Sequence, residues 1–461
     1  MTAEKVTVYI TNYNYGRFLE KAITSVLAQT YPNIEILIFD DGSTDDSSSI
    51  LEKYADDPEI KIFKKKNEGL NATIIKAFET ATGNYVVRLD ADDWFEPRII
   101  EKLVTEIKKD DEIALVFPDY YEVDENGNIL HRIKRHDFND NVTILDQPAH
   151  GACTLVRKKH YYDVGGHSRA YSCQDGVDLW LALTHKYKVA NLNEPLFFYR
   201  KHSESLSSNQ FRLLQTRFNI YADHARHRGF QSEETLAIIP IRKKRFVNGD
   251  YALINVAGRS LLNWTISKAE RSKEIDRIAV VTESDDIIEY IESGQPGYSK
   301  PTKAYRRDSK LAAVGTDVAE TILTFLEKPE NSKVKTVVVL TIDTPFSLVN
   351  YIDTAIYSMF LFGTDSVDSV ITDNALLYYH DGQGLKLWQD IRVRKEREYA
   401  YLRKGGISVI KVEELKKQKT MVTQRMGHVI IDKISSYTIE TSDDVTIASF
   451  IGNQILGIEN E

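Results

Sequence analysis

Short apolar runs alternate with helix-like stretches along the first 200 residues of the chain. Apolar runs of strand length occupy residues 6–11, 34–41 and 84–93. Stretches with helical patterns occupy residues 16–29, 43–54 and 70–82. Strands that alternate with helices are typical of a parallel or mixed sheet that is covered by helices. The first part of the chain is therefore predicted to fold as an α/β domain.

The pattern changes near residue 205 and then begins again. Residues 205–235 are polar, with Arg and His among Phe, Leu and Tyr, and we expect them to form a helical connector. Further apolar runs of strand length follow at residues 236–241, 276–283 and 335–343. A chain of 461 residues has room for two to four domains of about 100–200 residues each. The second half is therefore predicted to be another α/β domain.

Composition and charge narrow the class of protein. Hydrophobic residues make up 42% of the chain and charged residues 28%, which is the balance of a globular protein. The formal net charge of −9 argues against a nucleic acid as the main partner. The two cysteines, Cys153 and Cys173, offer no disulfide framework, and a reducing compartment is expected.

No apolar run in the sequence has the length of a membrane span. Such a helix needs about 18 consecutive apolar residues, and the first apolar run of the chain is also too short for a signal peptide. We therefore expect a cytoplasmic protein, or one at the inner face of the membrane, whose membrane contact is at most peripheral.

Clusters of aspartate follow two of the predicted strands. Asp40 and Asp41 end the second strand, and Asp90, Asp92 and Asp93 end the third. Turn and helix-cap chemistry explains either cluster taken alone. In open α/β sheets, however, ligands bind beyond the carboxyl ends of the strands. Aspartates spaced in this way also offer the hard oxygen ligands that Mg²⁺ or Mn²⁺ prefers. Two clusters at two strand ends therefore favour a ligand site.

Five segments of the first half carry further motifs in a fixed order. They are residues 6–47, 67–97, 151–168, 173–183 and 197–207. In these segments the chain resembles the family 2 glycosyltransferases of the GT-A fold, and the resemblance covers residues 1–205. It implies a Rossmann-like nucleotide-diphospho-sugar transferase domain, an inverting transfer and a nucleotide-sugar donor, with a UDP-sugar favoured.

The resemblance also implies roles on the donor side. Thr11 and Tyr13 would line the nucleoside pocket, Asp40 would bind the base, and Asp41 would lie beside it. The family usually carries a basic residue for phosphate shortly after the segment NEGL. Here that residue is Lys76, which comes later in the chain than usual.

On the reacting side, the resemblance implies a base and a divalent metal ion. Asp90 would reach the ribose or the metal, Asp92 would coordinate Mg²⁺ or Mn²⁺, and His202 would contact the diphosphate or the metal. Asp175 would be the general base, and the Glu that usually precedes it is Gln174 here. An inverting displacement needs one base for the acceptor hydroxyl and positive charge on the leaving diphosphate, which is consistent with these roles.

Motif-like segments also recur in the second half. They occupy residues 237–266, 276–291, 340–356 and 401–411. With them, residues 236–461 resemble the cytidylyltransferases that make CMP-activated acidic sugars of the sialic acid or Kdo type. Where that family has Gly-Gly, this chain has Lys243-Lys244. Where it has a metal-binding Asp-Ile-Asp, this chain has Thr438, Ile439 and Glu440. A Cβ obstructs a tight phosphate cradle, and threonine is a poor ligand for a hard cation. We expect a domain that keeps this fold without its nucleotidyl transfer.

These observations combine into one expectation for the whole chain. Residues 1–205 are predicted to form the glycosyltransferase domain, 206–235 the connector, and 236–461 a cytidylyltransferase-like domain that is available for homodimer formation. The enzyme would build a surface polysaccharide or another glycoconjugate on a glycan or lipid-linked acceptor. Two alternatives stay open: a bifunctional enzyme that also makes a CMP-activated acidic sugar from CTP, and a non-enzymatic scaffold.

Overall fold

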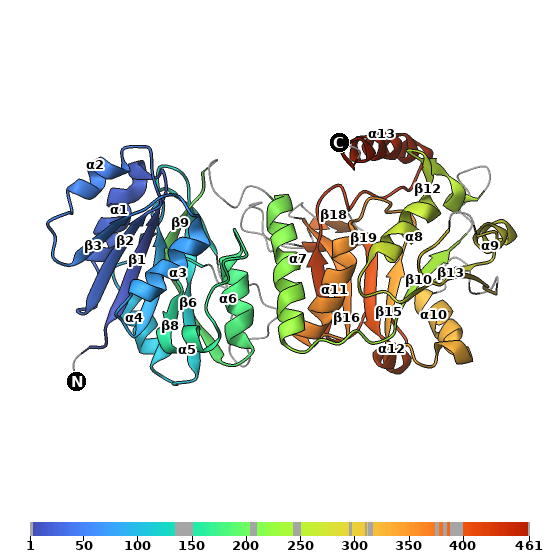
Figure 1. The fold of residues 1–461 in the computed structure, drawn as a ribbon, viewed down its shortest axis with the longest axis horizontal. Helices are drawn as coiled ribbons and strands as arrows, with labels where there is room; N and C mark the ends of the chain where they lie inside the picture. Colours follow the sequence, from blue (N-terminus) through green and yellow to red (C-terminus); the bar gives the residue numbers. More distant parts are fainter. Residues whose placement is uncertain are drawn as a thin grey trace. The chain divides into compact units, whose positions relative to one another are not determined.

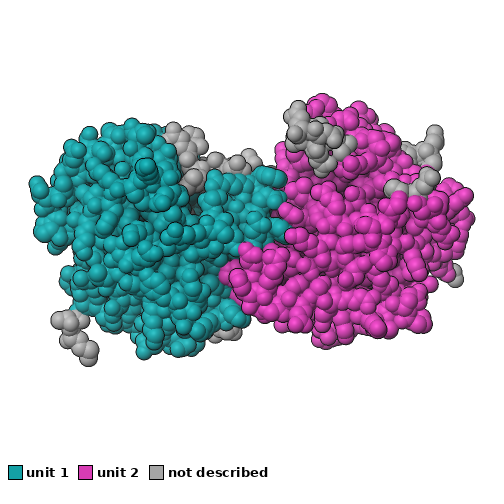
Figure 2. All heavy atoms as spheres, viewed as in Figure 1, with its two compact units in different colours: residues 1–220, 391–396 teal, residues 221–390, 397–461 magenta. Residues whose placement is uncertain are grey.

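The chain folds into two compact units, which are described separately. The computed structural model describes residues 3–133, 151–202, 210–242, 250–294, 297–308, 311, 317–373, 378–380, 385–387 and 400–459. Each unit contains a mixed β-sheet with helices packed against it (Figure 1). Unit 1 comprises residues 1–220 with 391–396, and unit 2 comprises residues 221–390 with 397–461 (Figure 2).

Among the described residues, the sheet of unit 1 is built from nine strands. They are β1 Val6–Asn12, β2 Ile34–Asp40, β3 Ile60–Lys64, β4 Tyr85–Asp90, β5 Trp94–Phe95, β6 Ile113–Val123, β7 Ile129–Ile133, β8 Leu155–Arg157 and β9 Lys188–Arg200. Their order is β3-β2-β1-β4-β8-β6-β9-β5, with β7 paired to β6. The first four strands in this order are parallel, so their carboxyl ends meet at one edge. Strand β8 is antiparallel to both neighbours, which makes the sheet mixed.

Helices cover both faces of this sheet because its strands alternate apolar side chains between the faces. The helices are α1 Gly16–Leu27, α2 Ser47–Glu52, α3 Leu70–Thr80, α4 Ile99–Ile107, α5 Lys158–Asp163 and α6 Asp175–Thr184. Val8 and Ile10 belong to a core that includes residues of α1, α2 and α4. Tyr9 and Val86 belong to the opposite core, with residues of α3 and α6. Arg88, two positions after Val86 on β4, therefore lies on the α3/α6 face.

The hydrophobic pattern predicted the elements that carry the aspartates. The three expected strands in the first half correspond to β1, β2 and β4, and the expected helices to α1, α2 and α3, with ends that differ by a few residues. The mixed sheet covered by helices is confirmed for unit 1. The hydrophobic pattern did not predict β3 or the strands from β5 to β9. Strands β8 and β9 pair with β6 across long stretches of the chain, whereas β7 pairs with β6 locally.

In the part of unit 2 that the structure describes, the sheet has seven strands in the order β14-β13-β10-β15-β19-β16-β20. They are β10 Thr235–Ile241, β13 Arg277–Thr282, β14 Thr302–Arg306, β15 Thr336–Leu340, β16 Ser366–Asp373, β19 Ala400–Lys411 and β20 Met426–Ile430. Two small antiparallel pairs accompany them: β11 Asn255–Val256 with β12 Arg259–Ser260, and β17 Tyr378–His380 with β18 Leu385–Leu387. The strands expected near 236, 276 and 335 are β10, β13 and β15, which are parallel.

Helices pack against both faces of the second sheet as well. They are α8 Leu261–Arg271, α9 Asp285–Glu292, α10 Val318–Leu326, α11 Val349–Phe362 and α12 Val412–Gln418. Helix α13, Ser442–Glu459, packs beside β11 of the small strand pair. The core on one face joins β10, β13 and β15 to α10 and α12. Helix α11 packs against β16, β19 and β20. Helix α7, Gln210–His227, lies within the segment expected to be a helical connector. Throughout the described ranges, no helix is long and apolar enough to cross a lipid bilayer.

One lysine is buried inside unit 2. Lys268 lies on α8, and its Nζ donates hydrogen bonds to the carbonyl oxygen of Thr344 at 2.8 Å and to Ser347 Oγ at 2.7 Å. Burial lowers the pKa of its ammonium group from 10.5 to about 7, against a smaller opposing effect of Asp343. Lys268 therefore anchors the segment that follows β15, and its charge is costly to bury at low pH.

The stability of unit 2 is expected to rise with pH. Between the folded pKa of about 7 and the unfolded value near 10.5, the unfolded chain holds a proton on Lys268 that the folded chain lacks. Lys268 should then add up to about 1.4 kcal/mol of stability per pH unit in this window. Calorimetry at pH 6.5, 7.5 and 8.5 on the parent and on Lys268→Met, which cannot titrate, measures this contribution. Parallel pH profiles for the two chains would show that folding leaves the pKa of Lys268 unchanged.

Candidate functional site

Polar side chains from three parallel strands meet at the carboxyl edge of the sheet in unit 1. Thr11 and Asn12 end β1, between Asp40 at the end of β2 and Asp90 at the end of β4. Thr11 Oγ1 donates a hydrogen bond to Asp90 Oδ1 at 2.7 Å, and Asn12 Nδ2 donates one to Asp40 Oδ1 at 2.9 Å. The two predicted carboxylate clusters are thus tied to the strand that lies between them.

The loops after β1, β2 and β3 add to the donor side of this edge. Ser43 also donates a hydrogen bond to Asp40. The carboxylate of Asp41 pairs with Lys65 and accepts hydrogen bonds from the backbone N–H groups of residues 68 and 69, at 3.0 Å and 2.9 Å. Asp41 therefore orders the loop that precedes α3. Tyr13 is 45% exposed at the end of β1, where its ring is accessible to a ligand.

Asp92, the second aspartate of the Asp-x-Asp pair, contacts a histidine that follows β9. Asp92 Oδ2 lies 2.9 Å from Nε2 of His202, whose fully buried ring packs between Tyr15 and Phe18. Next to it, Asp93 accepts a hydrogen bond from the backbone N–H of residue 200 at 2.8 Å, which fixes the strand that leads to His202. The structure thus brings together two predicted residues that are 110 positions apart.

Burial and mutual repulsion disfavour the charged forms of these carboxylates. Burial raises the pKa of Asp90; Arg88 opposes this shift and Asp92 adds to it. Burial, with Asp92 and Asp90, also raises the pKa of Asp93 well above its ordinary value. Oδ2 of Asp93 is buried without a hydrogen-bond partner. Repulsion of this kind is relieved by a nearby cation.

Asp92, His202 and the neighbouring aspartates are better suited to a divalent cation that binds together with a diphosphate than to one that the protein holds by itself. Among the described side chains, no group of three His, Cys, Asp or Glu is arranged to hold a metal ion by itself. Mg²⁺ is nevertheless usually bound through one or two carboxylates together with phosphate oxygens of a substrate. Asp92 and His202 offer two neighbouring ligand atoms, and Asp90 lies close enough to affect the Asp93 carboxylate.

A buried arginine joins the Asp-x-Asp pair to the predicted base. Arg88 Nη1 lies 2.7 Å from Asp175 Oδ2, and Arg88 Nε lies 3.1 Å from Asp90 Oδ1. Burial alone would lower the pKa of Arg88, but the two carboxylates raise it. A Cβ at Gly151 would come within 2.6 Å of Asp175 Oδ2 and 2.7 Å of Arg88 Nη2. The residue at 151 must therefore be glycine for this ion pair to form.

Asp175 occupies the first position of α6. The carbonyl oxygen of Gln174 accepts hydrogen bonds from the backbone N–H groups of Val177 and Asp178 at 3.0 Å and 3.2 Å, which begins the helix. The positive end of the helix dipole stabilises a carboxylate there. The ion pair and the helix terminus thus both place a carboxylate at this position in favourable contacts.

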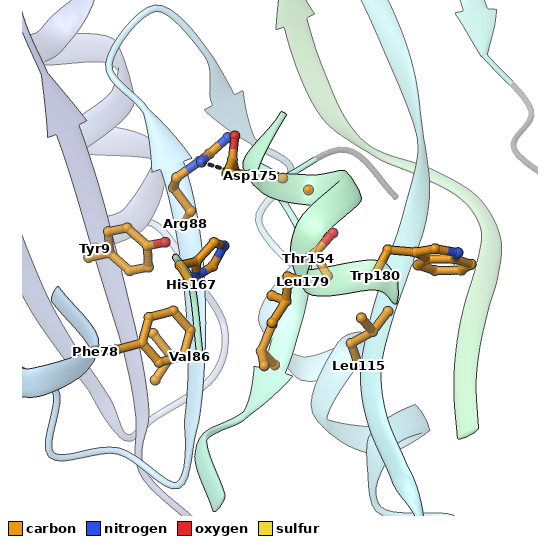
Figure 3. A pocket seen from close by; sticks show the side chains of 13 residues that line it. Tyr9, Phe78, Val86, Arg88, Leu115, Thr154, His167, Asp175, Leu179 and Trp180 are labelled. Carbon is orange, nitrogen blue, oxygen red and sulfur yellow. Dashed lines mark hydrogen bonds and ion pairs between the residues drawn. The ribbon is translucent and has the colours of Figure 1, made fainter. Parts of the chain in front are cut away.

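A cavity lies beside the Arg88–Asp175 ion pair, on the α3/α6 face of the sheet (Figure 3). Its empty volume is about 420 Å³, including the space at its mouth. Most of the lining is apolar, and the polar groups include Tyr9, Thr154 and His167. Burial lowers the pKa of His167 and raises that of Tyr9 well above its ordinary value, so both side chains are neutral at pH 7.

The predicted site residues do not all lie together. Lys76 is on α3 with its side chain 57% exposed, and its ion-pair partner is Glu79 on the same helix, at 3.5 Å. A phosphate contact by Lys76 stays a prediction. Lys65, which pairs with Asp41, is the basic residue that the structure joins to the donor-side cluster.

Sequence reasoning predicted Asp175 but missed Arg88 and the other polar residues that line the cavity. A charged residue within the apolar run YVVRLD was the available signal for Arg88, because a buried arginine needs a carboxylate partner. Tyr9, Thr154 and His167 gave no signal, since hydroxyl and imidazole groups are common in ordinary cores.

Comparison with known proteins assigns the N-terminal part to a family. Residues 7–165, about a third of the chain, match the model of Glycosyl transferase family 2. A chondroitin synthase of Escherichia coli is 36% identical over 126 residues, which cover 27% of this chain and 18% of that protein. An uncharacterized glycosyltransferase of a Nostoc species is 42% identical over 115 residues, covering 24% of this chain and 35% of that one. The N-terminal part thus contains a family 2 glycosyltransferase domain, as its motifs predicted.

The chain spans only a minor part of the length of these relatives. Among solved structures, residues 1–349 of S. aureus TarS in complex with UDP-GlcNAc align with a TM-score of 0.41 at 17% identity. This alignment covers 48% of the present chain and 66% of that one.

Removal of the Arg88 guanidinium is expected to destabilise unit 1. In Arg88→Met, the buried carboxylates of Asp175 and Asp90 would lose their partner, which typically costs about 3–5 kcal/mol. The double variant Arg88→Met/Asp175→Asn removes one of the unpaired charges and should recover part of the loss. Urea denaturation of the parent, Asp175→Asn, Arg88→Met and the double variant measures both effects. Equal midpoints for the parent and Arg88→Met would contradict a structural role for this ion pair.

Proposed function

We propose that unit 1 transfers a sugar from a nucleotide-sugar donor to an acceptor hydroxyl, with inversion at the anomeric carbon. The observation that carries this proposal is the connection between the Asp-x-Asp pair and Asp175 through Arg88. It joins carboxylates suited to the donor with a carboxylate suited to deprotonating the acceptor. The family 2 glycosyltransferase domain at residues 7–165 supports the same reaction class.

The donor side of the proposal follows the strand ends. Thr11 and Tyr13 contact the nucleoside, Asp40 binds the base with Asp41 beside it, and Asp90 reaches the ribose. A UDP-sugar is the favoured donor. In support, Thr11 and Asp40 are buried at the carboxyl edge of the sheet, where ligands of open α/β sheets bind.

We assign the divalent ion, Mg²⁺ or Mn²⁺, to Asp92 and His202 with Asp90 close by. When bound, such an ion neutralises charge on the diphosphate and so favours its departure. The raised pKa of Asp93, which burial and the two neighbouring aspartates cause, supports a site that gains from added positive charge.

The reaction requires a base on the opposite side of the anomeric carbon from the leaving group. Asp175 takes the proton of the acceptor hydroxyl while the acceptor oxygen forms its bond to the anomeric carbon. The bond from that carbon to the diphosphate oxygen breaks, and its electron pair leaves with the nucleoside diphosphate. Arg88 orients Asp175 and remains protonated throughout, because its pKa is raised by Asp175 and Asp90.

The acceptor is proposed to be a growing glycan or a lipid-linked sugar of a surface polysaccharide or another glycoconjugate. One relative is named a chondroitin synthase, which supports a glycan acceptor. We place the reaction in the cytoplasm, with membrane contact, if any, at the inner face. A non-enzymatic scaffold is disfavoured, because the proposed base and the Asp-x-Asp pair are all present.

For the second half, we propose a cytidylyltransferase-like domain that has lost nucleotidyl transfer, with domain limits of 1–205, 206–235 and 236–461. The altered phosphate loop, Lys243 to Phe246, lies outside the described residues. Close to Glu440, the carboxylate of Asp444 accepts hydrogen bonds from Tyr437 Oη and from the N–H groups of residues 440 and 441, at 2.8–3.1 Å. The Asp444 carboxylate is thus already hydrogen-bonded to groups of neighbouring residues. The proposed role of the domain is ligand or acceptor binding, or homodimer formation.

Transfer activity tests the proposal for unit 1. The full chain, with Mn²⁺, is incubated with UDP-glucose, UDP-GlcNAc, UDP-glucuronate and GDP-mannose, and release of nucleoside diphosphate is measured with and without oligosaccharide acceptors. We expect turnover of one donor that is abolished by EDTA. Asp175→Asn and Asp92→Ala should lower kcat at least about a hundredfold, because general-base catalysis alone contributes about that much. Asp163→Asn, an exposed carboxylate on α5, is the control. Parent rates in either site variant would refute the mechanism.

Pyrophosphate release tests the proposal for the second half. The full chain is incubated with CTP, Mg²⁺ and a panel of acidic sugars that includes sialic acid and Kdo. We expect no pyrophosphate above background, because the Asp444 carboxylate is held by four donor groups of its own turn. Pyrophosphate formation with any of these sugars would establish the bifunctional alternative.

A further inference from the structure

The residue before the proposed base has an unusual backbone conformation. Gln174 has φ 61° and ψ 28°, in the left-handed region, at the N-cap of α6. Residues other than glycine enter this region at a cost, and an N-cap residue normally has an extended conformation. Strained conformations of this kind persist where the surrounding structure holds them, and they cluster at functional sites.

The side chain of Gln174 is held by helix α7. Its Oε1 accepts two hydrogen bonds from one guanidinium, from Arg217 Nε at 3.1 Å and from Arg217 Nη2 at 2.8 Å. The same stretch of α7 holds the two preceding residues. Cys173 Sγ lies 3.1 Å from Thr216 Oγ1, and Arg212 Nη2 donates to the carbonyl oxygen of Ser172 at 3.2 Å. Three consecutive residues before Asp175 are therefore bonded to three residues of α7.

A competing conformation explains what these bonds prevent. The chain enters α6 through Gln174, so the backbone angles of Gln174 set the direction from which Asp175 begins the helix. If Gln174 relaxed to the extended conformation that is usual at an N-cap, the entry to α6 would change direction and Asp175 would shift relative to Arg88. With Gln174 left-handed, Asp175 Oδ2 lies 2.7 Å from Arg88 Nη1.

We propose that Arg217 is a positioning residue for the base. By holding Gln174 in the left-handed conformation, Arg217 keeps the Asp175 carboxylate directed at Arg88 and the reacting hydroxyl. The inference rests on the proposed function, in which Asp175 is the base. It adds that the position of Asp175 is set from two sides, by Arg88 from the sheet and by Arg217 from α7.

The inference predicts a change in kcat without a change in donor binding. In Arg217→Met, Gln174 can relax and Asp175 moves, so kcat should fall between about ten- and a hundredfold, as is common for small misplacements of a reacting group. The KM for the donor should stay unchanged, because the proposed nucleoside contacts lie at the ends of β1, β2 and β4 and not on α6 or α7. The assay measures nucleoside diphosphate release from whichever of the four test donors the parent chain turns over.

Glycine provides the decisive rescue. Glycine adopts the left-handed conformation without strain, so the double variant Arg217→Met/Gln174→Gly should recover several-fold in kcat over Arg217→Met alone. Arg226→Met is the control on the same helix, where Arg226 pairs with Asp223. A parent-like kcat in Arg217→Met, or a double variant no better than Arg217→Met, would overturn the inference.

Hydrogen–deuterium exchange separates this inference from the proposed function. In the full chain, peptides covering residues 172–183 should exchange faster in Arg217→Met than in the parent, and more slowly again in the double variant. This readout does not require turnover. If the parent releases no nucleoside diphosphate from any donor, the proposed function fails, and the exchange pattern still decides whether Arg217 holds the start of α6. Unchanged exchange in Arg217→Met would refute the role of Arg217 in holding the start of α6.

Discussion

The candidate site depends on one buried cation. The guanidinium of Arg88, on β4, is removed from water, and burial of a charge is costly unless carboxylates lie next to it. Asp90 on the same strand and Asp175 on α6 provide them. The ion pairs therefore require the start of α6 to lie against the α3/α6 face of the sheet, and they require residue 151 to be small. Much of the local architecture follows from this single charge.

The pattern of apolar residues predicted the strands and helices that carry the donor side, because those elements are short, regular and adjacent in sequence. It also placed Asp40 and Asp90 at the ends of strands, and the structure brings these two strand ends to one edge of the sheet, on either side of β1. The contacts of Arg88 could not be predicted in the same way. Its partner Asp175 is 87 positions away, and only the folded sheet determines which helix terminus faces β4.

Basic residues show the same limit of sequence reasoning. Lys76 was selected by its place after the segment NEGL, yet helix α3 turns its side chain toward solvent and Glu79. Lys65 follows β3, where a parallel neighbour brings the loop beside Asp41. A motif fixes distance along the chain, whereas contact depends on strand order. For the same reason, the bonds from α7 to Gln174 were invisible in the sequence.

The two sides of the site differ in how far family resemblance extends to them. Residues 7–165, the family 2 glycosyltransferase domain, contain Thr11, Asp40, Arg88, Asp90 and Asp92. Four residues of the site lie beyond that range. Asp175 begins α6 and Gln174 precedes it, His202 follows β9, and Arg217 is in α7. The family match thus covers the residues that we propose for the donor side. The proposed position of the base rests on contacts within this chain, which are a buried ion pair on one side and a strained residue held by an arginine on the other. In the proposed reaction, these contacts decide where the acceptor proton goes.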